Sequence, residues 1–227
     1  VVAMIGGRSQ DELQQTYSLN RGFQSFKQPG SSIKPLVIYT PALEEGYDAN
    51  STLTEIDVKA AKKSTSEKIS KMSGKKMSLR YAVEDSKNGC AYSLYNIITP
   101  KVGLSYIENM NFSKIVQQDY TLSSGLGGLH HGTNTVEMAN AYSTLENHGE
   151  YRQADCISSI LDASGNEIYE EPESKMVYTR SASDQMTDIL EGVLNSSAGT
   201  AKGLKWSSAS DVAAAAKTGT TKDRKSV

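Results

Sequence analysis

The chain has 227 residues and a formal net charge of -2, and 37% of its residues are hydrophobic. This length suffices for one large domain with a substantial core, and the apolar fraction excludes a largely disordered chain. The near-balanced charge gives no sign of a nucleic-acid partner.

The cysteines, the search for membrane signals and the runs of charge indicate little about the function or location of the protein. Cys90 and Cys156 are far apart and form no C-x-x-C pair, so we expect two isolated, half-buried thiols. No segment has the pattern of a signal peptide or a membrane span. Basic residues crowd between Lys59 and Lys76, and we interpret that run as a solvated surface.

The first elements in chain order are strands. Residues 1–5 form a short β-branched run stopped by paired glycines, which predicts a buried strand. A second strand is expected near residues 16–19. Gln28-Pro29-Gly30 is a turn signal.

A helix is predicted immediately after that turn, from Ser31 to Glu45. Ser31 lies at or next to its N-cap, and Pro35 falls in the first turn, where proline is tolerated. Pro41 should kink the helix or end it early. Gly46 is a suitable C-terminal stop.

The middle of the chain predicts short helices. Residues 50–76 are polar, and their pattern predicts no specific element. Helices follow at about 78–84 and 89–98, the second closed by Pro100. The spacing of Ser105 and Glu108 predicts that a further short helix starts there.

The last third mixes helices and strands. Asn134 and Glu137 have capping-box spacing and open a helix that runs to about His148. A β-hairpin is predicted over residues 156–169, an amphipathic helix over 183–195, and a strand over 211–221. Strands at both ends and helices between them predict a mixed α/β (α+β) domain whose sheet is built from sequence-distant pieces.

Three short motifs occur in order along the chain: Ser31-Ser32-Ile33-Lys34, Ser86-Lys87-Asn88 and Lys217-Thr218-Gly219. Each is weak evidence alone. A second S-x-x-K lies at 73–76, and two further S-x-N triplets lie at 18–20 and 164–166. Their context must therefore decide among them.

Context favours Ser31 as a nucleophile. It opens a helix, where unsatisfied N–H donors meet the positive end of the dipole. Lys34 is one turn along, on the same face. A serine hydroxyl needs an adjacent base, and Lys34 can act as one only if burial and a nearby cation, such as Lys217, lower its pKa. Ser73 and Lys76 lie in a Lys-rich polar run, which would keep that lysine protonated.

Ser86 and Lys217 supply the remaining groups. Ser86 lies in a linker between two predicted helices, so its hydroxyl can relay a proton while Asn88 bonds the substrate amide. On a strand, Lys217, Thr218, Gly219 and Thr220 would offer a cation, hydroxyls and N–H groups to an extended peptide carboxylate. The N–H groups of Ser31 and Thr220 are candidates for an oxyanion hole.

Together these motifs resemble those of penicillin-binding proteins and serine β-lactamases. Further stretches resemble class A penicillin-binding proteins in particular and cover nearly the whole chain: residues 2–8, 20–21, 28–35, 77–82, 126–128, 137–142 and 217–221. The family usually has glycine where this chain has Ala216.

The resemblance implies an antiparallel sheet with helices on both faces and the active site at their junction. It implies acylation of Ser31 by a peptidoglycan stem peptide ending in D-Ala-D-Ala, and inhibition by β-lactams, without a cofactor or metal. We expect the chain to be a partial transpeptidase domain, 1–227. The glycosyltransferase domain, membrane anchor and C-terminal strands of the family would lie outside it. We therefore expect this fragment to fold marginally and to turn over substrate poorly. The resemblance also implies that the activity is on the extracytoplasmic face of the membrane.

Three alternatives stay open. A β-lactamase needs a group that activates water, and Glu191 to Asn195 fits such a pattern only superficially, inside a predicted helix. A D,D-carboxypeptidase would use the same residues with water as acceptor. A non-catalytic binding module is disfavoured because all three motifs are intact.

His130, His131 and His148 have no ligand spacing typical of a metal site, so we interpret them as structural.

Overall fold

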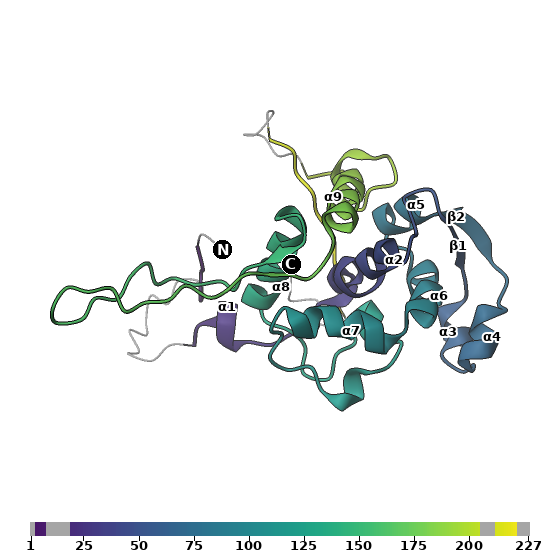
Figure 1. Ribbon diagram of the computed structural model, residues 1–227. Coiled ribbons are helices and arrows are strands. Elements are labelled where there is room, and N and C mark those ends of the chain that lie inside the picture. The colour runs from purple at the N-terminus through teal and green to yellow at the C-terminus, as the bar shows by residue number, and fades with distance from the viewer. Residues whose placement is uncertain (1–2, 8–18, 205–211, 222–227) are drawn as a thin grey trace.

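The computed structural model describes residues 3–7, 19–204 and 212–221. Within them it is mainly helical, with two small antiparallel sheets (Figure 1). The α-helices are α1 Arg21–Gln24, α2 Thr40–Glu44, α3 Val58–Ala61, α4 Ser66–Ser70, α5 Leu79–Glu84, α6 Asn88–Ile98, α7 Pro100–Asn109, α8 Thr135–Glu146 and α9 Arg180–Asn195. The strands are β1 Thr52–Glu55, β2 Lys75–Ser78, β3 Glu150–Tyr151 and β4 Lys175–Met176.

The mixed helix-and-sheet class and the antiparallel pairing are confirmed. β1 pairs with β2, with Thr52 opposite Ser78, and β3 pairs with β4, with Glu150 opposite Met176. These two-stranded sheets are smaller than the sheet that the resemblance implies, and the helices form most of the described fold.

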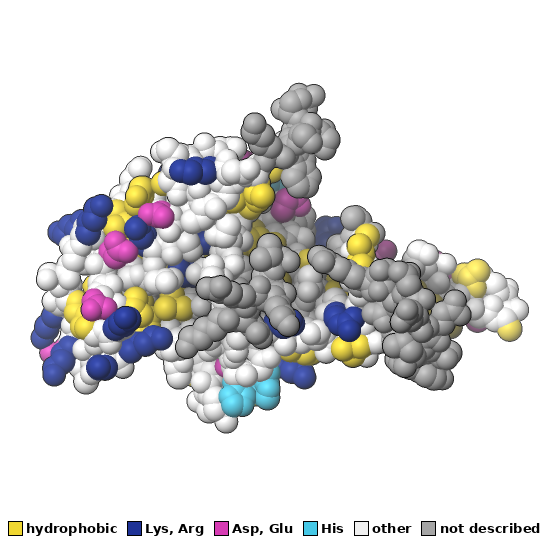
Figure 2. Space-filling model, turned by 180° about the vertical axis from the view of Figure 1, so that it is seen from behind, with side chains coloured by type: hydrophobic (Ala, Val, Ile, Leu, Met, Phe, Trp, Pro, Cys, Tyr) yellow, Lys and Arg dark blue, Asp and Glu magenta, His cyan; other side chains and the backbone are white. Residues whose placement is uncertain are grey.

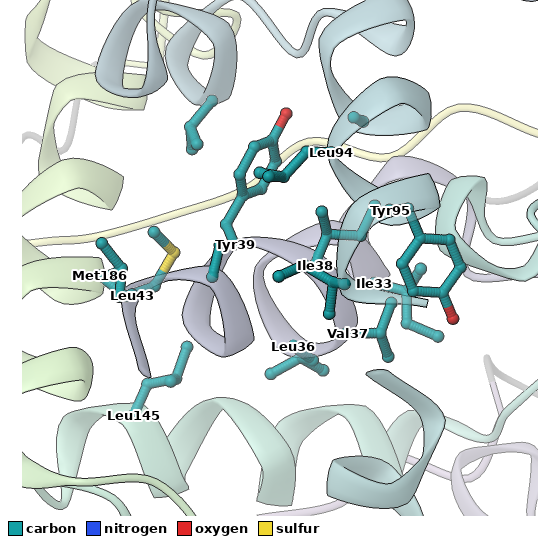
Figure 3. Close-up of a cluster of buried hydrophobic side chains, with 14 of the residues drawn as sticks. Ile33, Leu36, Val37, Ile38, Tyr39, Leu43, Leu94, Tyr95, Leu145 and Met186 are labelled. Carbon is teal, nitrogen blue, oxygen red and sulfur yellow. The ribbon is translucent and has the colours of Figure 1, made fainter. Parts of the chain in front are cut away.

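A continuous helical segment forms the centre of the molecule. It starts as a 3-10 helix over Gly30–Ile33, widens into a π-helix over Pro35–Tyr39 and ends as α2. Side chains from Ile33 to Leu43 project all around it into the core (Figure 3). A helix that is apolar on every side must be buried on every side. Residue 31 is therefore fixed at the start of the most enclosed element of the described chain.

The helix predicted at 31–45 is confirmed in position, with different geometry. Pro41 falls at the start of α2, where its missing N–H costs nothing, because the widened π-turn before it absorbs the mismatch. Gly46 follows the helix with a φ of 90°, the left-handed conformation that suits a glycine stop.

The helices around this segment were largely predictable. α5 has Ser78 as its N-cap, α6 ends just before Pro100, and α8 carries the expected capping box of Asn134 and Glu137. α9 begins at Arg180, slightly earlier than predicted, because the Thr179 hydroxyl caps it. α9 packs on α2, α5 and α8 and completes that side of the core (Figure 1).

Two predictions, one about a helix and one about the thiols, were wrong, and a stretch for which the sequence predicted no element contains regular structure. The helix expected to start at Ser105 begins at Pro100, with Thr99 as N-cap, and Ser105 lies inside it. For residues 50–76 the sequence predicted no specific element. The structure has β1, α3, α4 and the start of β2 there, and each is too short to show a periodic pattern of apolar residues. Cys90 and Cys156 are free, one buried and one exposed rather than both half-buried.

The strand predictions were wrong for most described residues. Residues 3–5 are exposed and have no strand partner among the described residues, while residues 1–2 and 16–18 lie outside the described residues. The hairpin at 156–169 has its turn at Asp162–Gly165 but only one bridge, between Leu161 and Glu167. It projects as a long arm (Figure 1), and a lone two-stranded ribbon is marginal in water.

The strand predicted at 211–221 is also absent from its described part, residues 212–221. A strand requires a hydrogen-bonded neighbour. Here the Ala216 N–H instead donates to the carbonyl of Leu190 in α9, at 3.2 Å. The segment is thus held against a helix, and it still reaches the 29–32 turn, as described below.

The basic run between Lys59 and Lys76 is a solvated surface, as predicted. All seven of its lysines are exposed. They gather at the end of the molecule formed by α3, α4 and β2 (Figure 2). Among helices built only from described residues, none has the length and apolar character that crossing a bilayer requires.

Candidate active site

The turn before the central helix holds Ser31 in a tight conformation. Gly30 has a φ of 56°, and residues 30–33 form a 3-10 turn with Pro29 as the N-cap residue. A 3-10 helix has about three residues per turn, so side chains at i and i+3 lie on one face. Ser31 and Lys34 therefore share a face, as the S-x-x-K spacing predicts, although Ser31 is the second residue of the turn rather than its cap.

The two side chains on that face differ sharply in exposure. Ser31 is half-buried, whereas Lys34 is 0% exposed. Lys34 Nζ donates to the backbone oxygen of Ser86 at 2.9 Å and to Oδ1 of Asn88 at 2.7 Å. A buried lysine would be costly without such acceptors.

Burial, and after it the positive charge of Lys217, lowers the pKa of Lys34 to about 7. The nearby Cys90 acts weakly in the opposite direction. Lys34 is thus substantially neutral near pH 7, and both physical causes that the sequence predicts for this shift, burial and a second cation, are present.

Ser86 joins the two amines. It lies between α5 and α6, as expected, with a φ of 54°, a left-handed conformation unusual for serine. Its carbonyl accepts from Lys34, while its Oγ accepts from Lys217 Nζ at 2.7 Å. Strained backbone of this kind tends to cluster at functional sites.

Lys217 belongs to the same group of contacts around Ser86. Its Nζ also donates to the carbonyl of Thr218 at 3.0 Å. Burial lowers the pKa of Lys217 to about 8. At pH 7 it therefore remains mostly cationic while Lys34 is about half neutral.

The residues after Lys217 lie against the serine turn. A Cβ placed on Gly30 would come within 2.6 Å of the Thr220 carbonyl oxygen and 3.1 Å of its nitrogen. A Cβ on Gly219 would lie 2.7 Å from the Pro29 carbonyl oxygen. The backbone of Thr220 is therefore next to residue 30, one position before Ser31.

Sequence reasoning missed three supporting contacts. The Tyr142 hydroxyl donates to the Ser32 carbonyl at 2.7 Å. Gly127 packs so closely on Gly30 that a Cβ added to Gly127 would lie 2.3 Å from the Gly30 nitrogen. Thr218 Oγ1 shares a hydrogen bond with Thr200 at 2.7 Å. Gly127 and Tyr142 fall in stretches that carry the family resemblance, but nothing in the sequence marks Thr200.

The rival residues lie elsewhere. Ser73 and Lys76 are exposed at the lysine-rich end of the molecule. Glu191 lies inside α9, as predicted. His148 pairs with Asp184 at 2.6 Å, and His130 and His131 stack edge to face. Across the described residues, no group of three or more His, Cys, Asp or Glu could hold a metal ion.

Comparison with known proteins decides the family. The sequence model for the penicillin binding protein transpeptidase domain matches residues 1–226. The chain belongs to this family. Its relatives are class A penicillin-binding proteins, as the motifs predict.

Two curated relatives illustrate the similarity. The chain is 29% identical to penicillin-binding protein 4 of Bacillus subtilis over 200 residues, which are 88% of this chain and 31% of that protein. It is 33% identical to penicillin-binding protein 2a of Streptococcus pneumoniae over 212 residues, 90% of this chain and 27% of that protein. The chain thus spans about a third or less of the length of these relatives.

Solved structures share the fold. The D,D-transpeptidase domain of a peptidoglycan glycosyltransferase from Eggerthella lenta matches with a TM-score of 0.66 at 19% identity, over 91% of this chain and 57% of that one. The PonA1 protein from Mycobacterium tuberculosis, solved in complex with penicillin V, matches with a TM-score of 0.63 at 16% identity, over 78% of this chain and 50% of that one.

Proposed function

We propose that this penicillin-binding transpeptidase domain is a serine-type D,D-transpeptidase that cross-links peptidoglycan stem peptides through an acyl-enzyme on Ser31. The observation that carries the proposal is the convergence of two amines on Ser86, from Lys34 at 2.9 Å and from Lys217 at 2.7 Å. One amine with a pKa of about 7 and one of about 8 provide a base and a cation together near neutral pH.

Hydrogen-bond capacity supports Lys34 as the base. A neutral amine has two N–H donors and one lone pair. The acceptors on Ser86 and Asn88 take both donors. The lone pair is then left for the Ser31 hydroxyl, which shares the face of the turn.

Acylation then proceeds in balanced steps. Lys34 takes the Ser31 proton as Oγ attacks the carbonyl of the penultimate D-Ala. The N–H groups of Ser31 and Thr220 stabilise the oxyanion, a contribution of roughly 3 to 4 kcal/mol per donor in comparable sites. The C–N bond breaks, the proton passes from Lys34 through the Ser86 hydroxyl to the departing nitrogen, and D-Ala leaves.

Deacylation reverses the proton transfers. The amine of a neighbouring stem peptide attacks the ester carbonyl, gives up a proton and releases the Ser31 hydroxyl. Water as acceptor would give D,D-carboxypeptidase activity from the same groups. The terminal carboxylate of the donor would bind beside Lys217, Thr218 and Gly219. Because this substrate lies outside the cell membrane, we infer that the activity is on the extracytoplasmic face.

The test is labelling with a fluorescent penicillin. The strained amide of a β-lactam acylates the same serine, so we expect a stable adduct with the native chain and with Ser73→Ala, and none with Ser31→Ala. Rapid hydrolysis of the penicillin would indicate a β-lactamase instead. A folded native chain that forms no adduct would indicate a binding module.

A further inference from the structure

A groove of about 460 Å³ opens beside the serine turn, and of its lining residues only Gly219 has a role in the chemistry described above. Ser32 and Gly219 form its wall toward the active site. It extends from there along the other side of the turn, toward Thr133 and Thr135 before and at the start of α8. A substrate held at Ser31 therefore has an adjoining space for a further part of the same peptide.

The charge in this groove is of one sign. Arg21 and Lys27 line it, and no Asp or Glu is among its described lining residues. Both cations are exposed, and neither forms an ion pair with a carboxylate of the described chain. Hydroxyls of Ser25, Thr133 and Thr135 complete a lining that suits an anionic ligand group.

The backbone positions of the two cations are fixed. The Lys27 N–H donates to the Thr133 carbonyl at 2.9 Å, and the Thr133 N–H donates back at 2.8 Å. The Arg21 N–H donates to the Gly6 carbonyl at 2.8 Å, at the start of α1. A pair of cations on fixed backbone loses less freedom when it binds a ligand than two mobile ones would.

We propose that Arg21 and Lys27 form a subsite for a second carboxylate of the peptide substrate, located within a few residues of the bond that Ser31 attacks. The proposal rests on the proposed transpeptidase function and adds a specificity determinant to it. The two cations attract the carboxylate and orient the peptide. Neither takes part in proton transfer.

The test uses two synthetic peptide thioesters that are alike except for one side chain near the reactive carbonyl, a free carboxylate in one and its carboxamide in the other. Ser31 attack breaks the C–S bond and releases a thiol that can be followed optically. We expect the native chain to favour the carboxylate peptide in kcat/KM by roughly three- to tenfold, since two exposed charge contacts act together. The effect should lie in KM and vanish at roughly 1 M salt, where the Debye length is about 3 Å.

Variants assign the preference to the groove. Arg21→Gln and Lys27→Gln should each reduce the ratio of the two rates, and the double variant should abolish it. Lys101→Gln, an equally exposed lysine on α7 outside the groove, should keep the native ratio. The ratio is measured within each variant, so a general loss of active protein does not alter it.

The two proposals fail differently. Equal rates for both peptides in the native chain, or a preference that survives in the double variant, would overturn the subsite while penicillin labelling of Ser31 stays intact. If neither peptide reacts and penicillin labels nothing, the transpeptidase proposal itself is wrong and the subsite falls with it.

Discussion

The amine of Lys217 lies 2.7 Å from the hydroxyl of Ser86, although 131 positions separate them in the sequence. The backbone of Ser86 simultaneously accepts from Lys34. One residue in a short linker thus contacts both amines of the proposed mechanism, the base Lys34 and the cation Lys217. It also keeps them near each other, so that the charge of Lys217 adds to the larger effect of burial in lowering the pKa of Lys34.

This arrangement predicts a bell-shaped pH dependence of Ser31 acylation. The rate should rise as Lys34 loses its proton, with a pKa of about 7, and fall as Lys217 loses its charge, with a pKa of about 8. Because the two amines interact, the apparent pKa values of the rising and falling limbs of the profile describe the pair of lysines rather than either lysine alone. Stopped-flow acylation by penicillin from pH 5 to 10 would measure them, and a rate that is flat across neutral pH would contradict this assignment.

Asn88→Asp should move the acid limb of that profile to higher pH. Asn88 Oδ1 accepts from Lys34 Nζ at 2.7 Å, so the substitution puts a carboxylate where an amide was. A negative charge at this distance favours the protonated amine and raises its pKa, by about one to three units in comparable pairs. Acylation at pH 7 should become roughly five- to five-hundredfold slower across that range of shifts, because less Lys34 is neutral.

Asn96→Asp is the matched control for that substitution. Asn96 lies on the same helix, α6, and bonds to Ser66 and Ser70 rather than to the amines. The variant adds the same charge to the protein, so its acid limb should coincide with that of the native chain. An equal displacement in both variants would show a general charge effect instead.

Ser86→Ala should slow acylation and leave the fold intact. The variant removes the hydroxyl that Lys217 contacts, which in the proposed mechanism relays the proton to the leaving group. Loss of such a proton-transfer group costs about 10²- to 10⁴-fold in rate. Alanine also has a Cβ, so the strain at the φ of 54° is nearly unchanged and the melting temperature should stay close to native.

Ser105→Ala provides the comparison for Ser86→Ala. Ser105 Oγ bonds only to the Val102 carbonyl within its own helix, among the described residues. Its removal should affect neither rate nor stability appreciably. If Ser86→Ala acylates at the native rate, the proton relay must be assigned to another group.

The sequence predicted the site more fully than the fold around it. Ser31 and Lys34, like Ser86 and Asn88, belong to short motifs whose spacing is local, so a 3-10 turn orients the first pair and one linker the second. Lys217 reaches Ser86 from a separate segment, 131 positions along the chain. The interpretation of residues 211–221 as a strand failed because pairing depends on a neighbour that local pattern does not reveal. The contact of Ala216 with Leu190 in α9 replaces that ladder and still brings Thr220 to Gly30.

Gly30 is the position where this juxtaposition is most sensitive to substitution. Its φ of 56° already disfavours an L residue, by roughly 1 to 2 kcal/mol. A Cβ would also lie 2.6 Å from the Thr220 carbonyl oxygen. Because that neighbour is backbone, relief requires the segment carrying Lys217 to shift away from the serine turn, and such overpacking costs about 1 to 3 kcal/mol more.

Gly46→Ala separates these two costs. Gly46 has a φ of 90° and nothing within 4 Å of the Cβ position, so its variant carries the backbone strain without the collision. Urea denaturation should show Gly30→Ala to be less stable than Gly46→Ala, and penicillin acylation should be slowed only in Gly30→Ala. Equal stability and equal acylation in the two variants would mean that residues 30 and 220 do not touch, and the site would lose the contact that holds the Thr220 backbone against the serine turn.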